Sequence, residues 1–104
     1  MKDKNRFSVL LEHLMSVADL KNSVLARAVQ YDDSYISKWI SGKLLPTEKN
    51  HENILMSISH CIVEALSEDS TAQLLQEYQL QNTEDLATAI YDNLESEYAY
   101  VKEF

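Results

Sequence analysis

Apolar residues recur at helical spacing along most of the chain, in stretches separated by short polar connections. Positions three and four apart share one face of an α-helix, so each stretch predicts an amphipathic helix. We expect helices over about 7–18, 23–30, 33–41 and 48–66, a short helix around 74–78, and a longer one beginning at 83. A single Gly and a single Pro in 104 residues leave little material for β-turns. The pattern therefore predicts an all-α fold.

The residues between the second and fourth expected helices carry the most informative capping and helix-ending signals in the chain. Asp32 stands directly before the helix expected over 33–41, where its carboxylate can accept the first free backbone N–H groups as an N-cap. Gly42 stands where that helix should end, free to take the left-handed conformation. Pro46 then terminates the connection that follows. Two short helices joined by a tight turn are what a helix-turn-helix requires.

The same stretch resembles the helix-turn-helix core of the Xre/Cro family, relatives of the lambda and other phage repressors. Leu25-Ala26 match the apolar–small pair in the middle of the family's second helix. The run Ile36-Ser37-Lys38-Trp39 matches its Ile-Ser-basic-Trp pattern. Gly42-Lys43 with Pro46 match its Gly-Lys-x-x-Pro exit. The resemblance covers about residues 7–66 and implies a lambda-repressor-like bundle of about four helices.

One position departs from the family pattern. Where the family usually has Gly in the turn, this chain has Gln30. A residue with a Cβ loses about 1 kcal/mol or more when it is forced to positive φ. We therefore expect the turn to be slightly remodelled.

The resemblance implies a sequence-specific, DNA-binding transcriptional regulator whose 33–41 helix reads the major groove of double-stranded DNA. Carried over by position, the residues exposed to the bases are Asp33, Ser34, Ser37 and Lys38, with Tyr35 at the edge. Phosphate contacts are expected from the start of the preceding helix and from nearby cations, namely Asn22, Ser23, Arg27 and Lys43. For Arg27, a solvent-exposed position without a DNA contact is an equally good interpretation. Ile36 and Trp39 are expected on the buried side, because Trp at helical spacing from Ile is more often core than a base-stacking platform.

The charge is divided unevenly along the chain. The net charge of −8 argues at first against nucleic acid, but residues 1–49 hold eight Lys/Arg and six Asp/Glu, a net of +2. Residues 50–104 hold one Lys and eleven Asp/Glu, a net of −10. The first half can face phosphate and the second cannot. Because Asp32 and Asp33 add electrostatic cost, we expect modest monomer affinity with strong salt dependence, which a dimer would improve.

The composition also shifts near Leu66, which predicts two parts: a helix-turn-helix domain at 1–66 and an acidic helical extension at 67–104. The last helix, with Thr83 as its expected N-cap, carries one apolar stripe that consists of Leu86, Ile90, Leu94, Tyr98 and Val101. Two alternatives stay open for this stripe. It packs on the first domain, or it pairs with a second copy or with a further C-terminal region.

Other function classes find little support. His60 and Cys61 are neighbours, and adjacent residues point to different sides of a helix, so no thiol–imidazole pair is expected. The three His lack metal-ligand spacing with a second Cys, and one Gly cannot build a phosphate-binding loop. We expect no enzyme activity, cofactor, metal or small-molecule substrate. No apolar run is long enough to span a membrane, and a single Cys fits a reducing cytoplasm.

A second function stays open beside DNA binding. The chain could be a protein-interaction module that kept the fold and lost DNA binding, with its acidic half contacting a basic partner. The net charge of −10 in residues 50–104 and the Asp32-Asp33 pair favour this alternative. A dimer interface that buries Ser34, Ser37 and Lys38 would support it.

Overall fold

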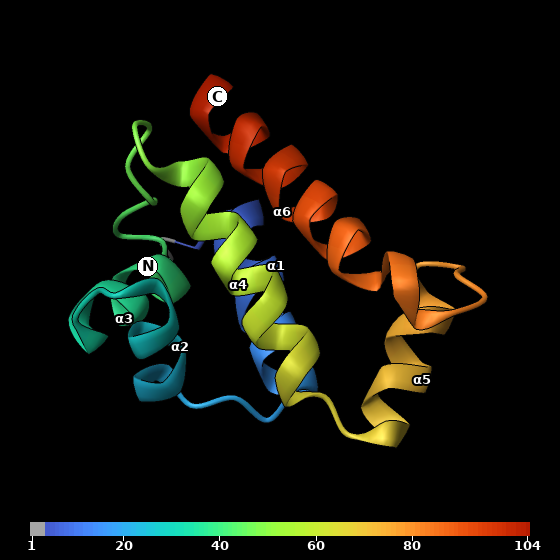
Figure 1. The fold of residues 1–104 in the computed structure, drawn as a ribbon. Coiled ribbons are helices and arrows are strands. Elements are labelled where there is room, and N and C mark those ends of the chain that lie inside the picture. Colours follow the sequence, from blue (N-terminus) through green and yellow to red (C-terminus); the bar gives the residue numbers. More distant parts are fainter. Residues whose placement is uncertain (1–3) are drawn as a thin grey trace.

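The computed structural model describes residues 4–104, and this part of the chain is helical without strands (Figure 1). Its elements in chain order are α1 (Arg6–Val17), α2 (Asn22–Val29), α3 (Asp33–Ser41), α4 (His51–Ala65), α5 (Glu68–Glu77), the 3-10 turn η1 (Thr83–Asp85) and α6 (Leu86–Glu103). The predicted all-α class is confirmed. Within these residues, no helix combines the length and the apolar character that crossing a membrane requires.

The helices enclose one apolar core. α6 packs against α4 and α1, α2 packs against α3 and α4, and α3 also packs against α1. Each α-helix contributes at least one fully or nearly fully buried large side chain, among them Phe7, Leu11, Leu25, Trp39, Leu55, Ile62, Leu74, Leu86 and Ile90. The α2–α3 pair therefore lies on one side of the α1–α4–α6 layer, and α5 lies at the opposite side (Figure 1).

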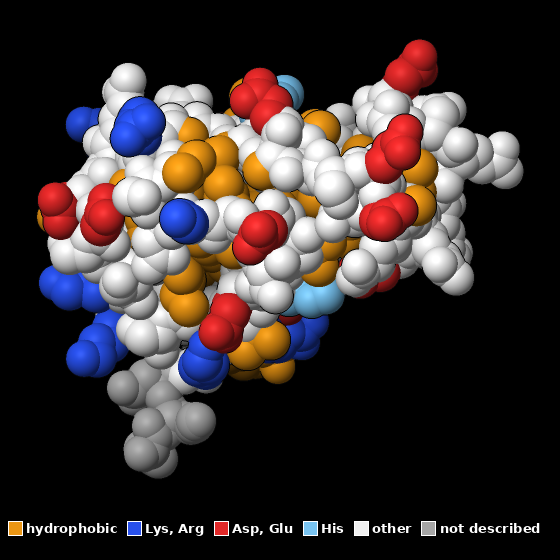
Figure 2. Space-filling view, turned by 90° about the horizontal axis from the view of Figure 1, so that it is seen from below, with side chains coloured by type: hydrophobic (Ala, Val, Ile, Leu, Met, Phe, Trp, Pro, Cys, Tyr) orange, Lys and Arg blue, Asp and Glu red, His pale blue; other side chains and the backbone are white. Residues whose placement is uncertain are grey.

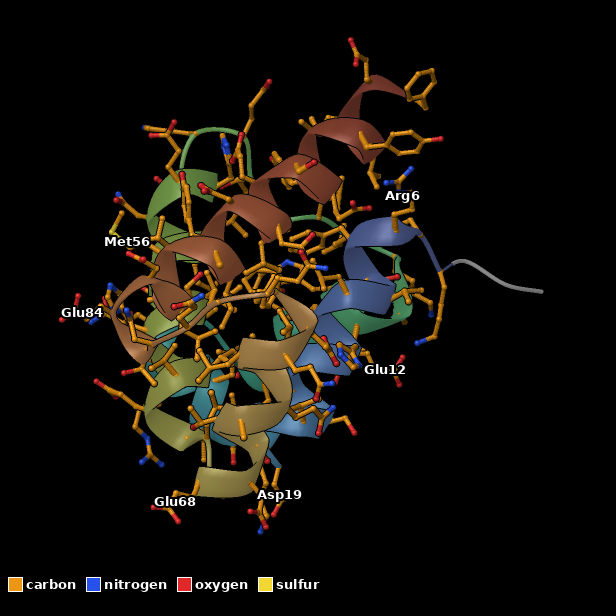
Figure 3. All side chains as sticks on the ribbon, turned by 90° about the vertical axis from the view of Figure 1, so that its right-hand side faces the viewer. Arg6, Glu12, Asp19, Met56, Glu68 and Glu84 are labelled. Atoms are coloured by element: carbon orange, nitrogen blue, oxygen red, sulfur yellow. The ribbon has the colours of Figure 1, made fainter. Side chains whose placement is uncertain are left out.

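The apolar stripe of the last helix packs inside the chain. Leu86, Ile90 and Leu94 have no exposed surface, and Tyr98 is 3% exposed. Polar contacts reinforce the same packing, because the Arg6 guanidinium donates to the Glu97 carboxylate at 3.0 Å and lies 3.9 Å from the centre of the Tyr100 ring. Figure 3 shows Arg6 at the start of α1, beside the C-terminal turns of α6. Of the two alternatives for the stripe, packing on residues 1–66 is the one observed.

Local capping signals set several helix ends. Asp32 is the N-cap of α3 as predicted, and its carboxylate accepts the Ser34 N–H at 3.1 Å. Gly42 ends α3 in the left-handed conformation with φ 88°, also as predicted. α1 begins one residue earlier than expected because Asn5 and Ser8 form a reciprocal capping box, in which each side-chain oxygen accepts the other residue's N–H at 2.8 Å.

The sequence predicts Asn22 or Ser23 as the N-cap of α2 and Thr83 as the N-cap of α6, and both predictions are wrong. α2 already begins at Asn22, so Lys21 occupies its N-cap position and there is no side-chain cap, and the Asn22 Nδ2 donates to Ser37 on α3. Thr83 is not the N-cap of α6, since Asn82 accepts the Glu84 N–H at 3.0 Å and opens η1 ahead of the helix.

α4 also begins later than expected, at His51 instead of residue 48. The Asn50 N–H donates to the Thr47 carbonyl at 3.2 Å and forms a separate turn before the helix.

The turn between α2 and α3 contains a non-glycine residue at positive φ. Gln30 itself takes the left-handed conformation, with φ 63° and ψ 41°. The Tyr31 N–H donates to the Ala26 carbonyl at 3.0 Å and the Gln30 N–H to the Arg27 carbonyl at 3.3 Å. These bonds satisfy the last carbonyls of α2 and offset the cost of placing a Cβ at positive φ, about 1–2 kcal/mol. The chain thus places Gln30 at a backbone position that usually favours Gly.

Candidate nucleic-acid interface

The candidate interface is built on α3, which has two unlike sides. Ile36 is fully buried and Trp39 is 1% exposed, and the Trp39 ring lies 5.6 Å from that of Tyr31. The predicted buried side of this helix is therefore confirmed. The opposite side is exposed and carries Asp33, Ser34, Ser37 and Lys38. Because residues four apart lie one above the other on a helix, these four side chains form one polar face.

The remaining predicted residues surround that face. Tyr35 is 42% exposed and packs edge-on against Tyr31 at 5.2 Å, so it lies at the rim of the polar face as expected. Asn22 is half-buried in the first turn of α2, and its Nδ2 donates to Ser37 Oγ at 3.3 Å. This bond joins a predicted phosphate contact to a predicted base contact. Ser23 follows in the same turn and is exposed.

The cations of the site are exposed and free of carboxylate partners. Within residues 4–104, none of Arg27, Lys38 and Lys43 takes part in an ion pair. Lys43 is held close to α3, because its own N–H donates to the Lys38 carbonyl at 2.9 Å. Arg27 lies in the last turn of α2, away from Asn22 and Ser23 at the start of that helix. No side-chain hydrogen bond in the described chain joins Arg27 to the other predicted residues.

The charges are segregated over the surface. Figure 2 shows Lys and Arg side chains grouped on the left, the side of α2 and α3, together with a few carboxylates. On the right, the side of α5, the charged side chains are carboxylates. The uneven division of charge along the sequence is thus an uneven division in space. A polyanion would meet a favourable field at the α2–α3 end.

The Asp32 carboxylate has an electrostatic role of its own. The N–H of Ser34 holds the pKa of Asp32 below its ordinary value of 3.8, because this hydrogen bond favours the ionised form. A carboxylate with a lowered pKa in the folded state stabilises the fold above its ordinary pKa, and this contribution is lost as the pH falls through the folded-state pKa.

Substitution of Asp32 should therefore change the acid sensitivity of the protein. We expect Asp32→Asn, which keeps the capping oxygen but cannot titrate, to lose less stability than the wild type on acidification from about pH 5 to pH 2. Asp32→Ala should be less stable than both at neutral pH, because it has no cap. Thermal melts followed by circular dichroism across this pH range measure the difference. Parallel pH profiles for wild type and Asp32→Asn would contradict the role of the titrating carboxylate.

The residues considered for other chemistry lie outside this face. Cys61 on α4 is half-buried, and burial raises the pKa of its thiol, which keeps it protonated. In the described chain, no three His, Cys, Asp or Glu side chains converge in a way that could hold a metal ion.

Comparisons with protein-family models, curated proteins and solved structures give no match for this chain. The assignment of the interface therefore rests on the geometry of α2 and α3.

Two features of the candidate interface were not predicted from the sequence. These are the Asn22–Ser37 bond and the bond from the Lys4 ammonium to the Ile40 carbonyl near the end of α3, at 3.4 Å. Both depend on chain packing, and no sequence motif marks either of them.

Proposed function

We propose that the chain is a sequence-specific DNA-binding transcriptional regulator of the lambda-repressor-like helix-turn-helix type, with α3 in the major groove. The observation that carries the proposal is the α2–turn–α3 unit with its uncovered polar face. The apolar side of α3 is buried, its N-cap and C-cap are in place, and the turn keeps a left-handed residue at Gln30. A helix that enters a groove needs this combination of a fixed position and a free polar side.

The polar face can read base edges. The Lys38 ammonium can donate to the O6 or N7 acceptors of guanine, and the Ser34 and Ser37 hydroxyls can pair with any base. Asp33 can accept from the N4 amino group of cytosine, which would favour a cytosine over the other bases at that position. Direct readout would therefore come from about four adjacent positions on one helix.

The start of α2 can hold a phosphate. α2 lacks a side-chain cap, so the first backbone N–H groups of this helix stay available to an anion. Asn22 connects this end of α2 to Ser37, so a phosphate bound there would fix α3 in the groove. Lys43 and Arg27 would add charge contacts on either side. A homodimer would double these contacts, and it would need a surface other than the buried stripe of α6.

Selection of bound fragments from a random DNA pool tests the proposal. The selection is run at about 50 and 200 mM salt, a range over which a protein with 6–10 phosphate contacts loses about 10³–10⁵ in affinity. We expect an enriched motif at low salt that weakens at high salt, and a palindrome if two copies bind. Folded protein that enriches no motif at either salt would contradict the proposal.

Substitutions of Lys38 and Lys43 should then distinguish a contact to a base from a contact to a phosphate. We expect Lys38→Ala to weaken binding to the selected site by about 1–3 kcal/mol and to relax specificity at one base pair. Lys43→Ala should weaken binding about equally for all sequences and reduce the salt slope by about one. Lys102→Ala removes the same charge from the last turn of α6, outside the assigned face, and serves as the control. Equal effects of all three substitutions would contradict the assigned face.

A protein-interaction module on the same fold is the second candidate. The exposed Asp32 and Asp33 at the start of α3 and the net charge of −10 in residues 50–104 favour a basic protein partner. In the single chain, Ser34, Ser37 and Lys38 are exposed, so an interface that covered them would have to come from a second molecule. A dimer in solution whose formation is blocked by Ser37→Glu, together with failed DNA selection, would favour this function.

A further inference from the structure

The segment that leaves the candidate DNA-reading helix is fastened to the C-terminal helix. Tyr98 on α6 donates its hydroxyl hydrogen to the Pro46 carbonyl at 2.8 Å, across 52 positions of sequence. Tyr98 is 3% exposed and Pro46 is buried. Figure 1 shows the loop between α3 and α4 rising to the same end of the molecule as the last turns of α6. The bond therefore joins the acidic half to the exit of the helix-turn-helix.

This segment has few other internal supports. Its first residues are held to α3, because the N–H groups of Gly42, Lys43 and Leu44 all donate to the Lys38 carbonyl at 2.9–3.2 Å. In the described chain, no backbone N–H from residues 45–49 donates to another backbone group. Pro46 has no N–H, so its carbonyl is its one polar backbone group and requires a donor when buried. The Tyr98 hydroxyl is the donor that the structure provides.

Tyr98 is itself held from several directions. Its ring packs edge-on against Phe7 of α1 at 5.9 Å and stacks on the His51 ring at 4.4 Å. His51 lies at the start of α4, with Nδ1 3.0 Å from the Glu48 carbonyl and Nε2 3.1 Å from the Glu95 carboxylate. Burial raises the pKa of the Tyr98 hydroxyl, so it remains a donor at neutral pH. The group that fastens the segment is thus fixed by α1, α4 and α6 together.

We propose that Tyr98 is a positioning residue for DNA binding, which holds the segment carrying Lys43 so that its ammonium meets a phosphate. This role rests on the proposed function. Pro46 lies three residues beyond Lys43, and the Lys38 carbonyl fixes the other end of this short stretch. The two anchors leave Lys43 little freedom relative to α3. Prior ordering of a contact residue lowers the cost of binding, because less entropy is lost when the contact forms.

The test compares Tyr98→Phe with Tyr78→Phe. Both substitutions remove one hydroxyl from a hydrogen bond of 2.8 Å, but the Tyr78 hydroxyl accepts from Asn93 and does not contact the segment. We expect backbone ¹⁵N order parameters over residues 44–49 to fall from about 0.85 towards 0.6 in Tyr98→Phe alone. Circular dichroism checks that both variants keep the helical fold.

DNA binding gives the second readout, as the slope of log K against log salt concentration on the selected site. We expect Tyr98→Phe to reduce this slope by about one phosphate contact, as Lys43→Ala does, and the double variant to show no further reduction. A merely structural role would lower stability and leave the slope unchanged, as expected for Tyr78→Phe.

The outcomes separate the two proposals. An unchanged slope in Tyr98→Phe, with wild-type DNA binding intact, overturns the positioning role alone. Order parameters that do not change in Tyr98→Phe overturn it as well. A folded wild-type protein without DNA affinity overturns the proposed function and this role together, even if the order parameters show that Tyr98 still orders the segment.

Discussion

Removal of residues 67–104 is expected to abolish the cooperative fold of the remaining chain. This segment supplies four fully buried aliphatic side chains, Leu74, Leu86, Ile90 and Leu94. Burial of one such side chain contributes about 1.5–3 kcal/mol, so the four together contribute about 6–12 kcal/mol. The whole stability of a small domain is about 5–15 kcal/mol. Truncation would also expose the faces of α1 and α4 on which α6 packs.

Thermal and urea unfolding of a 1–66 fragment, followed by circular dichroism, measures this effect. A chain that ends at Lys102 is the control, because it lacks only Glu103 and Phe104, which are exposed. We expect cooperative unfolding for the control and a gradual, non-cooperative signal for the fragment. A fragment that melts cooperatively would instead show that residues 1–66 form a complete domain and that the extension is an appendage.

The second large effect is expected from Trp39→Ala, which should reduce the free energy of unfolding by about 3–5 kcal/mol. The Trp39 side chain is 1% exposed and fixes α3 onto the core beside Tyr31. Urea unfolding by circular dichroism measures the loss, since the variant has no Trp fluorescence. Tyr35→Ala on the same helix removes a ring that is 42% exposed and should change stability far less.

Trp39→Ala also distinguishes between two possible roles of the Trp39 indole. A core residue lowers stability when truncated, whereas a base-stacking platform lowers DNA affinity and leaves the fold intact. A Trp39→Ala variant with wild-type stability and no DNA affinity would place the indole on the DNA side of α3. It would contradict the division of α3 into a buried and a polar side.

The features that were predicted correctly are those decided within a few residues. The Asp32 cap and the left-handed Gly42 follow from side-chain chemistry next to a periodic stretch, and both are observed. Prediction failed where neighbouring candidates compete. Asn22 and Thr83 are good caps by type, but Asn22 bonds to Ser37 and Asn82 takes the place of Thr83. Intrinsic preference could not decide these cases, because Asn22 makes a contact with another helix and Thr83 competes with an equally suitable neighbour.

The apolar stripe of α6 shows a second limit of prediction from the sequence. Its spacing of three and four predicted a helix with one apolar face, and that helix is present with Leu86, Ile90 and Leu94 buried. Periodicity does not say what covers such a face, so internal packing and pairing with another chain stayed equally open. The Tyr98–Pro46 bond could not be predicted for the same reason, since it joins residues 52 positions apart.

The exposed polar face was predictable because it is the complement of the buried one. Once Ile36 and Trp39 are assigned to the core, helical geometry places Ser34, Ser37 and Lys38 on the other side, and all three are exposed. The contact from Asn22 to Ser37 required the angle between α2 and α3, which no local pattern contains.

The segregated charge in Figure 2 gives the molecule a permanent electric dipole, with its positive end at α2 and α3. Near any extended polyanion, such a dipole experiences a torque before surfaces touch, because one end is attracted while the other is repelled. The molecule would therefore rotate during approach, and fewer encounters would present the wrong side. Since salt screens this field over about 8–10 Å, the orienting torque should fall with ionic strength even where the final contacts are unchanged.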